Sequence, residues 1–401
     1  MYDMSGFDYD IRDVVRVLNL RIRHKNAHSY DVDCPFCNFK TGKMNVNIER
    51  DVFRCNYCNE QGGMLDLYAK LYNLTKSEAN RQIREALNLG QYREDYKAPE
   101  RKEEPPPVES SERAKEEEID RTYSEMLSML TLSRKHQEDL LRRGLTPEQI
   151  CIQRYRSVPV FGMKQMVNAL LEKGCTVKGV PGFYLGEDGR WTVNLSAKKS
   201  GILIPVLSME GRIQGFQIRL DQVTDSRKYI WFSSVNNRLG TSSGSPVHII
   251  GSPEAEEVYV TEGALKGTIA HYLSGNTFIC AAGVTQYRSL KPVLEAFAGK
   301  NLRFVHEAFD MDKKMRVGCD RHSSHCGQCT LTGTPDSCPF RIKKRDVIQS
   351  GCRHVYEICQ GLSVPVRRLL WDVDGNGEWA GNVKGVDDYY YEVKKKAENR
   401  Q

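Results

Sequence analysis

Four cysteines near the N-terminus have the spacing of metal ligands. Cys34 and Cys37 form one CxxC pair, and Cys55 and Cys58 form a second pair seventeen residues further on. Two such pairs bring four thiolates together at tetrahedral spacing, which is the ligand set of structural Zn²⁺. Because the protein fills all four positions, none is left open for chemistry. The sequence therefore predicts a structural zinc site.

Carboxylates follow several apolar runs in the C-terminal part of the chain. Glu262 ends one run, Asp310 and Asp312 end another, and Asp387 and Asp388 follow a third. An Asp-x-Asp at a strand end lets both carboxylates reach one hard cation, and a glutamate from a neighbouring strand adds a ligand or a proton-transfer group. Such clusters hold Mg²⁺ or Mn²⁺ against a reacting phosphate. We expect phosphoryl or nucleotidyl transfer here.

A second group of cysteines lies just beyond Asp312. Its members are Cys319, Cys326, Cys329 and Cys338. We predict a second structural zinc that folds this segment; a reduced, metal-free loop and a redox switch are the alternatives. Cys352 and Cys359 are seven residues apart on an expected helix, so they share one face and are expected in the core.

Composition narrows the class of protein. The chain has 401 residues, enough for two or three domains, and its formal net charge of +6 permits nucleic-acid binding without requiring it. No apolar run approaches a membrane span, and the N-terminus lacks a signal pattern, so we expect no membrane association and a cytoplasmic, nucleoid-associated location. In that compartment, clustered cysteines among the 13 indicate metal binding rather than disulfides.

The elements that must position these residues fall into α+β and α/β domains. A helix is expected over 8–23, short strands over 44–48 and 52–54, a helix capped by Thr75 and Glu78, and a hairpin of 201–207 with 211–219. From 247 onward strands and helices alternate, which predicts a parallel sheet. Its expected strands are 258–261, 277–281, 302–309 and 364–370. The predicted domains are a zinc ribbon (1–91), a proline-rich charged linker (92–119), a mixed α+β basic subdomain (120–250) and an α/β catalytic domain (251–401) with a cysteine-rich insertion (313–340).

These motifs resemble those of DnaG-type bacterial and mobile-element primases. The run from Val258 to Gly263 with Asp310-Met-Asp312 resembles the Toprim domain, and the cysteine ribbon is similar to the CHC2-like zinc domain of primases. Between them, 141–148, 204–216 and Lys228-Tyr229 resemble the basic half of the primase polymerase core.

The resemblance implies a role for each matching residue. Glu262 would be the catalytic glutamate, Asp310 and Asp312 would bind magnesium, and Asp387 and Asp388 would be outer acids. Arg219 and Lys228 would hold template or nucleotide. Lys266 stands where primases usually carry a further acid, and it would pair with the acidic cluster or bind a phosphate of nucleic acid or nucleotide. The reaction would be synthesis of short RNA primers from ribonucleoside triphosphates on single-stranded DNA, with a replicative helicase as partner.

Basic and aromatic side chains are interleaved around the zinc ribbon. Lys43 and Arg54 accompany Phe36, Phe53 and Tyr57. This mixture suits a single-stranded template held by stacking and phosphate contacts. Two other functions use the same features: a Toprim-type nuclease, and a non-catalytic single-strand-binding module. The matches at 201–229 favour primase over the first, and the intact acids favour it over the second.

Overall fold

The structure, a computed structural model of the chain, describes residues 7–37, 41–58, 60–72, 74–87, 89, 109–224, 227–319 and 336–399. It divides into two compact units, Met1–Pro107 and Val108–Gln401. No helix in the described ranges is both long enough and apolar enough to cross a membrane. The fold is as predicted: an antiparallel ribbon carrying the four cysteines, then a helical and antiparallel region, then a mostly parallel sheet between helices.

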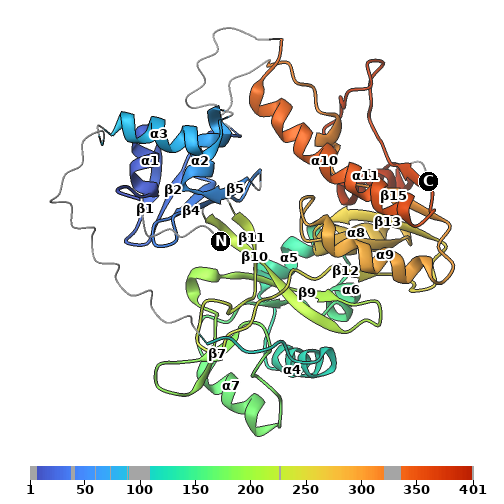
Figure 1. Ribbon diagram of the computed structural model, residues 1–401. Helices are drawn as coiled ribbons and strands as arrows, with labels where there is room; N and C mark the ends of the chain where they lie inside the picture. The colour runs from blue at the N-terminus through green and yellow to red at the C-terminus, as the bar shows by residue number, and fades with distance from the viewer. Residues whose placement is uncertain are drawn as a thin grey trace. The chain divides into compact units, whose positions relative to one another are not determined.

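The N-terminal unit is a five-stranded antiparallel sheet with three helices (Figure 1). Its strands are β1 (Ile22–Lys25), β2 (Ser29–Val32), β3 (Met44–Asn47), β4 (Val52–Cys55) and β5 (Gln61–Gly63). Its helices are α1 (Ile11–Val17), α2 (Met64–Tyr72) and α3 (Lys76–Ala86). The predicted strands over 44–48 and 52–54 are β3 and β4. The predicted capping box also forms, because Thr75 Oγ1 accepts from the Glu78 amide while Glu78 Oε2 accepts from the Thr75 amide.

The helix predicted over 8–23 is too long. It ends at Val17, and Asn19 takes a left-handed conformation with φ of 46°. The chain then pairs as β1 with β2, so Ile22 lies opposite Val32. The apolar residues after Val17 fit a helical period, but strand pairing outweighs that local pattern.

The second unit begins with an antiparallel sheet in the order β11-β10-β9-β6. Its strands are β6 (Arg156–Ser157), β9 (Gly201–Leu207), β10 (Ile213–Thr224) and β11 (Arg227–Trp231), and a separate hairpin joins β7 (Phe183–Leu185) to β8 (Trp191–Val193). Its helices are α4 (Glu116–Ser128), α5 (Arg134–Arg142), α6 (Pro147–Ile152) and α7 (Met163–Glu172), with a 3₁₀ turn, η1 (Ala197–Lys199). The predicted hairpin of 201–207 with 211–219 is β9 with β10.

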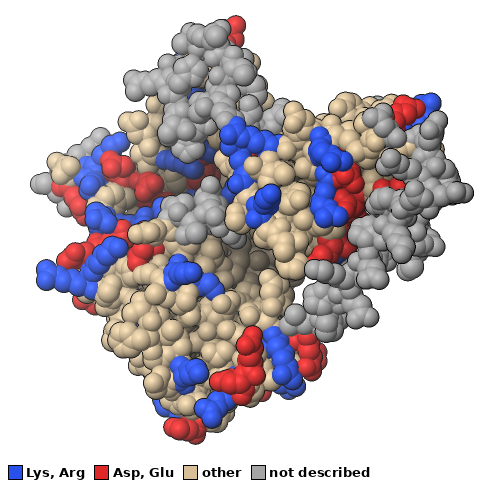
Figure 2. Space-filling view, turned by 90° about the vertical axis from the view of Figure 1, so that its left-hand side faces the viewer, with Lys and Arg blue, Asp and Glu red and all other residues tan. Residues whose placement is uncertain are grey.

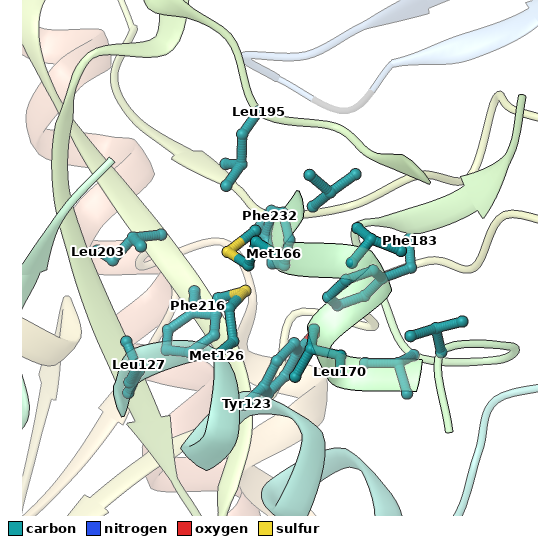
Figure 3. Close-up of a cluster of buried hydrophobic side chains, with 14 of the residues drawn as sticks. Tyr123, Met126, Leu127, Met166, Leu170, Phe183, Leu195, Leu203, Phe216 and Phe232 are labelled. Atoms are coloured by element: carbon teal, nitrogen blue, oxygen red, sulfur yellow. The ribbon is translucent and has the colours of Figure 1, made fainter. Parts of the chain in front are cut away.

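An aromatic core lies beneath this antiparallel sheet. Figure 3 shows Tyr123 and Met126 of α4 directed toward Phe216 of β10 and Phe232, with Phe183 of β7 completing the cluster. The rings of Tyr123 and Phe216 are 4.5 Å apart, centroid to centroid. Tyr123 also donates its hydroxyl to the carbonyl oxygen of Pro181, so its one polar atom is satisfied in the core.

Residues before α4 pair with the second unit. Ser110 bridges Gly240, and the guanidinium of Arg113 donates to the carbonyl oxygens of Gln214, Ser242 and Ser243. The predicted linker, 92–119, therefore overlaps at its C-terminal end with ordered contacts and with the first turn of α4. The predicted division into these domains otherwise stays a prediction.

The last sheet has the strand order β12-β14-β13-β15-β16. Its strands are β12 (His248–Ile250), β13 (Glu257–Glu262), β14 (Thr277–Ala281), β15 (Phe304–Glu307) and β16 (Val366–Arg368). The pairs β13–β14, β13–β15 and β15–β16 are parallel, and only β12 runs antiparallel to its neighbour. The connecting helices are α8 (Ala264–Ser274), α9 (Leu290–Ala298), α10 (Pro339–Gly361) and α11 (Val386–Glu398), with 3₁₀ turns η2 (Tyr287–Ser289) and η3 (Met311–Lys314).

Helices cover both faces of this parallel sheet (Figure 1). Val258 and Val260 of β13 point to the face packed by α9 and α10, whereas Tyr259 between them points to the face of α8 and α11. Cys352 and Cys359 of α10 are buried in the first of these layers, as predicted. Burial on both faces explains why the strands are almost continuously apolar until their polar ends.

A buried histidine joins the two sheets of the second unit. His248 Nδ1 of β12 accepts from the Leu207 amide of β9 at 3.0 Å, and Nε2 lies 3.1 Å from Thr268 Oγ1 of α8. Complete burial lowers the pKa of His248 to about 3. The imidazole is therefore neutral, with its proton on Nε2.

Candidate zinc centre and carboxylate site

The four predicted zinc ligands meet at one end of the N-terminal sheet. Their Sγ atoms all lie within 4.8 Å of one another; the Cys34–Cys58 separation is 3.8 Å and the Cys37–Cys55 separation is 3.5 Å. Cys34 follows β2 and Cys55 ends β4, so the antiparallel pairing itself brings the two knuckles together. Four clustered sulfur ligands form a closed, structural zinc site.

Hydrogen bonding favours the thiolate form of Cys55, whereas side-chain contacts with the other cysteines raise the pKa of Cys34. Side-chain contacts with Cys34, and then with Cys37 and Cys58, lower the pKa of Cys55. The backbone amides of Tyr57 and Cys58 also point at Cys55 Sγ, at 3.4 and 3.5 Å. These amides stabilise a sulfur that must be ionised to bind metal.

The predicted carboxylates lie at the carboxyl edge of the parallel sheet. Glu262 ends β13, and Asp310 and Asp312 follow β15, the strand beside it. Asp387 lies in the first turn of α11 and is buried, whereas Asp388 beside it is exposed. Ligands collect at this edge of open parallel sheets, so the topology places the acids where chemistry is expected.

Three lysines neutralise these acids. Lys266 of α8 pairs with Asp310 and lies 3.7 Å from Glu262 Oε1. Lys384 contacts Asp310 at 3.3 Å and Asp312 at 2.7 Å, and Lys344 of α10 contacts Asp312 at 2.8 Å. Lys266 was identified from the sequence. Lys344 and Lys384 were not, because the acids that they contact, Asp310 and Asp312, lie more than 30 positions earlier in the chain.

The charges shift the pKa values of the centre. Burial alone would lower the pKa of Lys266, but the surrounding acids raise it above its ordinary value. Burial would likewise raise the pKa of Asp312, but Lys344 and Lys384 lower it. Burial raises the pKa of Asp387 to about 6 even though Lys266 opposes the shift.

The donor set can hold a hard cation. Carboxylate oxygens are the ligands that Mg²⁺ takes, and Oδ1 of Asp387 is buried with no hydrogen-bond partner. In the described ranges, however, only the zinc cysteines bring three or more His, Cys, Asp or Glu ligand atoms within 4.8 Å of one another. Ammonium groups instead lie between the acids. The residues fit a cation bound by Asp310 and Asp312 in exchange for their contacts with Lys344 and Lys384.

A buried ion pair closes the loop that carries Asp310 and Asp312. Lys313 Nζ lies 2.7 Å from Glu307 Oε1, and both side chains are almost completely buried. Glu307 also accepts from the Phe309 amide and from the Tyr356 hydroxyl. This pair was not identified from the sequence, although an acid at the end of an otherwise apolar strand could have indicated it.

The residues predicted to contact nucleic acid differ in their exposure to solvent and in whether an acid already pairs with them. Lys228 of β11 is exposed, and its pKa is lowered by partial burial and by nearby Arg219. Arg219 is itself paired with Asp139 of α5. On the face in Figure 2, basic and acidic side chains are interspersed where described atoms are visible. Arg219 therefore contributes to a mixed rather than a purely basic wall.

In the N-terminal unit, Arg54 projects from the exposed face of β4, and Lys43 is half-buried just before β3. Phe53 is buried and stacks on Phe36 with centroids 5.6 Å apart, so the interpretation of Phe53 as a base-stacking residue is wrong. Alternation along β4 explains this, since Phe53 and Arg54 must face opposite ways. Tyr57 is half-buried.

The second cysteine group is described only in part. Cys319 and Cys338 are buried, and the Cys338 amide donates to the carbonyl oxygen of Val317 at 2.7 Å. Cys326 and Cys329 lie outside the described residues. The second zinc site stays a prediction.

The fold and the two sites define a class of protein with a structural zinc ribbon and a separate parallel-sheet unit with acids at its strand ends. Residues 7–98 match the family described as CHC2 zinc finger. A DNA primase of Clostridium acetobutylicum is 25% identical over 81 residues, which are 20% of this chain and 14% of that protein. The predicted resemblance to DnaG-type primases is thereby confirmed, and the matched region spans about one seventh of the curated relative.

Solved structures of primases are also similar to the chain. The zinc-binding and RNA polymerase domains of the Aquifex aeolicus primase superpose with a TM-score of 0.47 at 16% identity, covering 98% of this chain and 82% of that one. A DNA primase domain from Pseudomonas aeruginosa gives 0.41 at 13% identity, covering 71% and 78%. The RNA polymerase domain of Mycobacterium tuberculosis primase DnaG, in complex with a double-stranded DNA oligomer with a 6-nucleotide overhang, gives 0.38 at 14% identity, covering 59% and 81%.

Proposed function

We propose that the chain is a DnaG-type primase that synthesises short RNA primers on single-stranded DNA. The observation that carries this proposal is the placement of Glu262, Asp310 and Asp312 at the ends of two adjacent parallel strands, in a chain whose N-terminal unit matches the CHC2 zinc finger. Carboxylates at that position suit metal-dependent nucleotidyl transfer.

The reaction joins a ribonucleotide to a 3′-hydroxyl and releases pyrophosphate. Asp310 and Asp312 would hold a Mg²⁺ or Mn²⁺ ion, which supplies positive charge to the reacting phosphate. Glu262 would accept the proton of the attacking hydroxyl; its Oε2 is already oriented by the Val284 amide at 3.0 Å. Asp387 and Asp388 would serve as outer acids.

Binding would be divided between the two units. Arg54 and Lys43 of the zinc ribbon would hold template phosphates, while Arg219 and Lys228 would contact template or ribonucleoside triphosphate near the acids. The charges of Lys228 and Asp387 interact, and a substrate path between β11 and α11 would use both. Such an enzyme would act with a replicative helicase in the cytoplasm at the nucleoid, and an origin in a mobile element fits the same motifs.

Primer synthesis on single-stranded templates tests the proposal. The purified chain is incubated with labelled ribonucleoside triphosphates and Mg²⁺, beside an Asp310→Asn/Asp312→Asn variant. We expect labelled oligomers from the wild-type chain and a loss of about 100-fold or more from the variant, because both ligands of the cation are weakened. Glu295→Gln on α9 is the matched control, since Glu295 is an exposed acid of the same unit.

The two other functions give different products. A shortened template with no labelled oligomer would show that the chain is a Toprim-type nuclease rather than a primase. Template binding without either product, equal in wild type and variant, would indicate a non-catalytic binding module. Primer synthesis at the wild-type rate by the doubly substituted chain would refute the assignment of Asp310 and Asp312.

A further inference from the structure

The carboxylate site holds a lysine that is enclosed among the acids it neutralises. Lys266 lies four residues after Glu262, in the first turn of α8, and its ammonium contacts the carboxylates of both Glu262 and Asp310. Its charge also interacts with that of Asp387. Acids from β13 and from the loop after β15 therefore share one ammonium group, and the charge of an acid of α11 acts on it as well.

Lys266 is less free than Lys344 and Lys384 to move its ammonium group away from the acids. Its side chain is 19% exposed, against 36% for Lys344 and 45% for Lys384. Gly385 packs beside it: a Cβ there would lie at an ordinary contact distance of 3.5 Å from Lys266 Cε and only 2.5 Å from Asp387 Oδ1. The two outer lysines can rotate into solvent when a cation arrives, whereas Lys266 is held between the sheet edge and α11.

The helix that carries Lys266 is also fixed. A Cβ at Gly267 would lie 2.0 Å from Cys280 Sγ, so α8 approaches β14 as closely as only glycine allows. Thr268, the next residue, receives the buried contact from His248. The position of Lys266 is thus fixed by the packing of α8 as well as by the acids that contact its ammonium group.

A charge count then limits what else can bind. Four acids, Glu262, Asp310, Asp312 and Asp387, surround the site, and Lys266 neutralises one of them permanently. One divalent cation brings the remaining charge to minus one, whereas a second would bring it to plus one in a partly buried site, next to an ammonium that cannot withdraw.

We propose that Lys266 is a built-in cation that takes the place of a second metal ion, so that the centre binds one divalent cation, at Asp310 and Asp312. The inference rests on the proposed function, because it specifies how that function uses metal. Asp387, whose Oδ1 is buried without a hydrogen-bond partner, interacts by charge with Lys266 and Asp310 and would add negative charge near the ion.

Counting bound Mn²⁺ tests this role without template or nucleotide. The full chain, with its zinc retained, is titrated in metal-free buffer, and free Mn²⁺ is followed by its electron paramagnetic resonance signal. We expect one Mn²⁺ per wild-type chain and one for Lys266→Arg, which keeps the charge. Lys266→Met should bind two, the second at least ~10-fold more tightly than any second ion on the wild type, given a unit charge removed from about 5 Å away.

Lys384→Met is the matched control, because it removes from the same centre an ammonium group that is free to rotate into solvent. It should still bind one ion, with higher affinity. Lys266→Gln, whose amide can still reach Asp310, serves if Lys266→Met does not fold. Two ions on the wild-type chain would overturn the proposal, as would an unchanged count of one on the folded, neutral variants. The count is independent of primer synthesis, so failure of the proposed function would be seen separately in the primer assay.

Discussion

The buried His248 makes the second unit sensitive to acid. Its pKa falls from 6.5 to about 3 on folding because burial disfavours the imidazolium. Below about pH 6.5 the unfolded chain therefore binds a proton that the folded chain does not. The stability that neutral His248 contributes is therefore complete at neutral pH. It is lost as the pH falls from 6.5, the pKa of His248 in the unfolded chain, toward about 3, its pKa in the folded chain.

The magnitude follows from the same difference. A single proton taken up only by the unfolded state changes the free energy of unfolding by about 1.4 kcal/mol per pH unit. Between about pH 6.5 and about pH 4.5, His248 should therefore remove about 2 kcal/mol from the stability of the second unit. That loss is a large part of the stability of a typical domain.

Tryptophan fluorescence during urea unfolding measures this unit alone, because all four tryptophans, Trp191, Trp231, Trp371 and Trp379, lie beyond residue 108. His248→Asn is the control: its side-chain oxygen can still accept from the Leu207 amide, but it cannot titrate. Subtracting the two pH profiles removes the contribution of the acids. Parallel profiles for the two proteins would refute the reasoning, as would a folded-state His248 that titrates near pH 6.5 by NMR.

Three further changes probe other parts of the chain. Cys55→Ser should remove about one zinc per chain, measured by elemental analysis, and unfold the N-terminal unit; retained zinc with an intact ribbon would contradict the assignment. Lys313→Met leaves Glu307 charged and buried and should lower the free energy of unfolding in urea by about 3–5 kcal/mol. The double variant Lys313→Met/Glu307→Gln should regain much of that loss. If the effects of the two substitutions simply add, the two residues do not form a pair. Gly267→Ala should destabilise by about 1–3 kcal/mol despite the better helix propensity of alanine, and combination with Cys280→Ala should relieve the clash, which an unchanged loss would disprove.

Local patterns predicted the ribbon and the sheets well. The two CxxC pairs identify their ligands by spacing alone, and apolar runs ending in acids identify parallel strands because β13 and β15 are buried on both faces. The helix predicted over 8–23 failed where pairing of β1 with β2 outweighed a helical period. Phe53 was misjudged because its neighbours do not reveal which face of β4 is covered.

The composition of the carboxylate site was only half predictable. The acids follow strands, and a strand end can be read from the sequence. Lys344 and Lys384 reach the same point from a long helix and from a loop, and only the packed structure shows which of 58 basic residues do so. Ion pairs between residues far apart in the chain leave no pattern in the sequence, whereas an apolar run followed by an acid is a local pattern that can be recognised.

The wide spread of the site along the chain has a consequence during synthesis. The zinc ligands are complete at Cys58, but the carboxylate centre is complete only when Asp387, 329 positions later, has emerged and α11 has packed against α8. At translation rates of about 5–20 residues per second this interval lasts roughly 15–65 seconds. A nascent chain can thus load metal into its ribbon long before its carboxylate site is complete, so a ribosome-bound intermediate would carry a finished zinc ribbon and an unfinished carboxylate site.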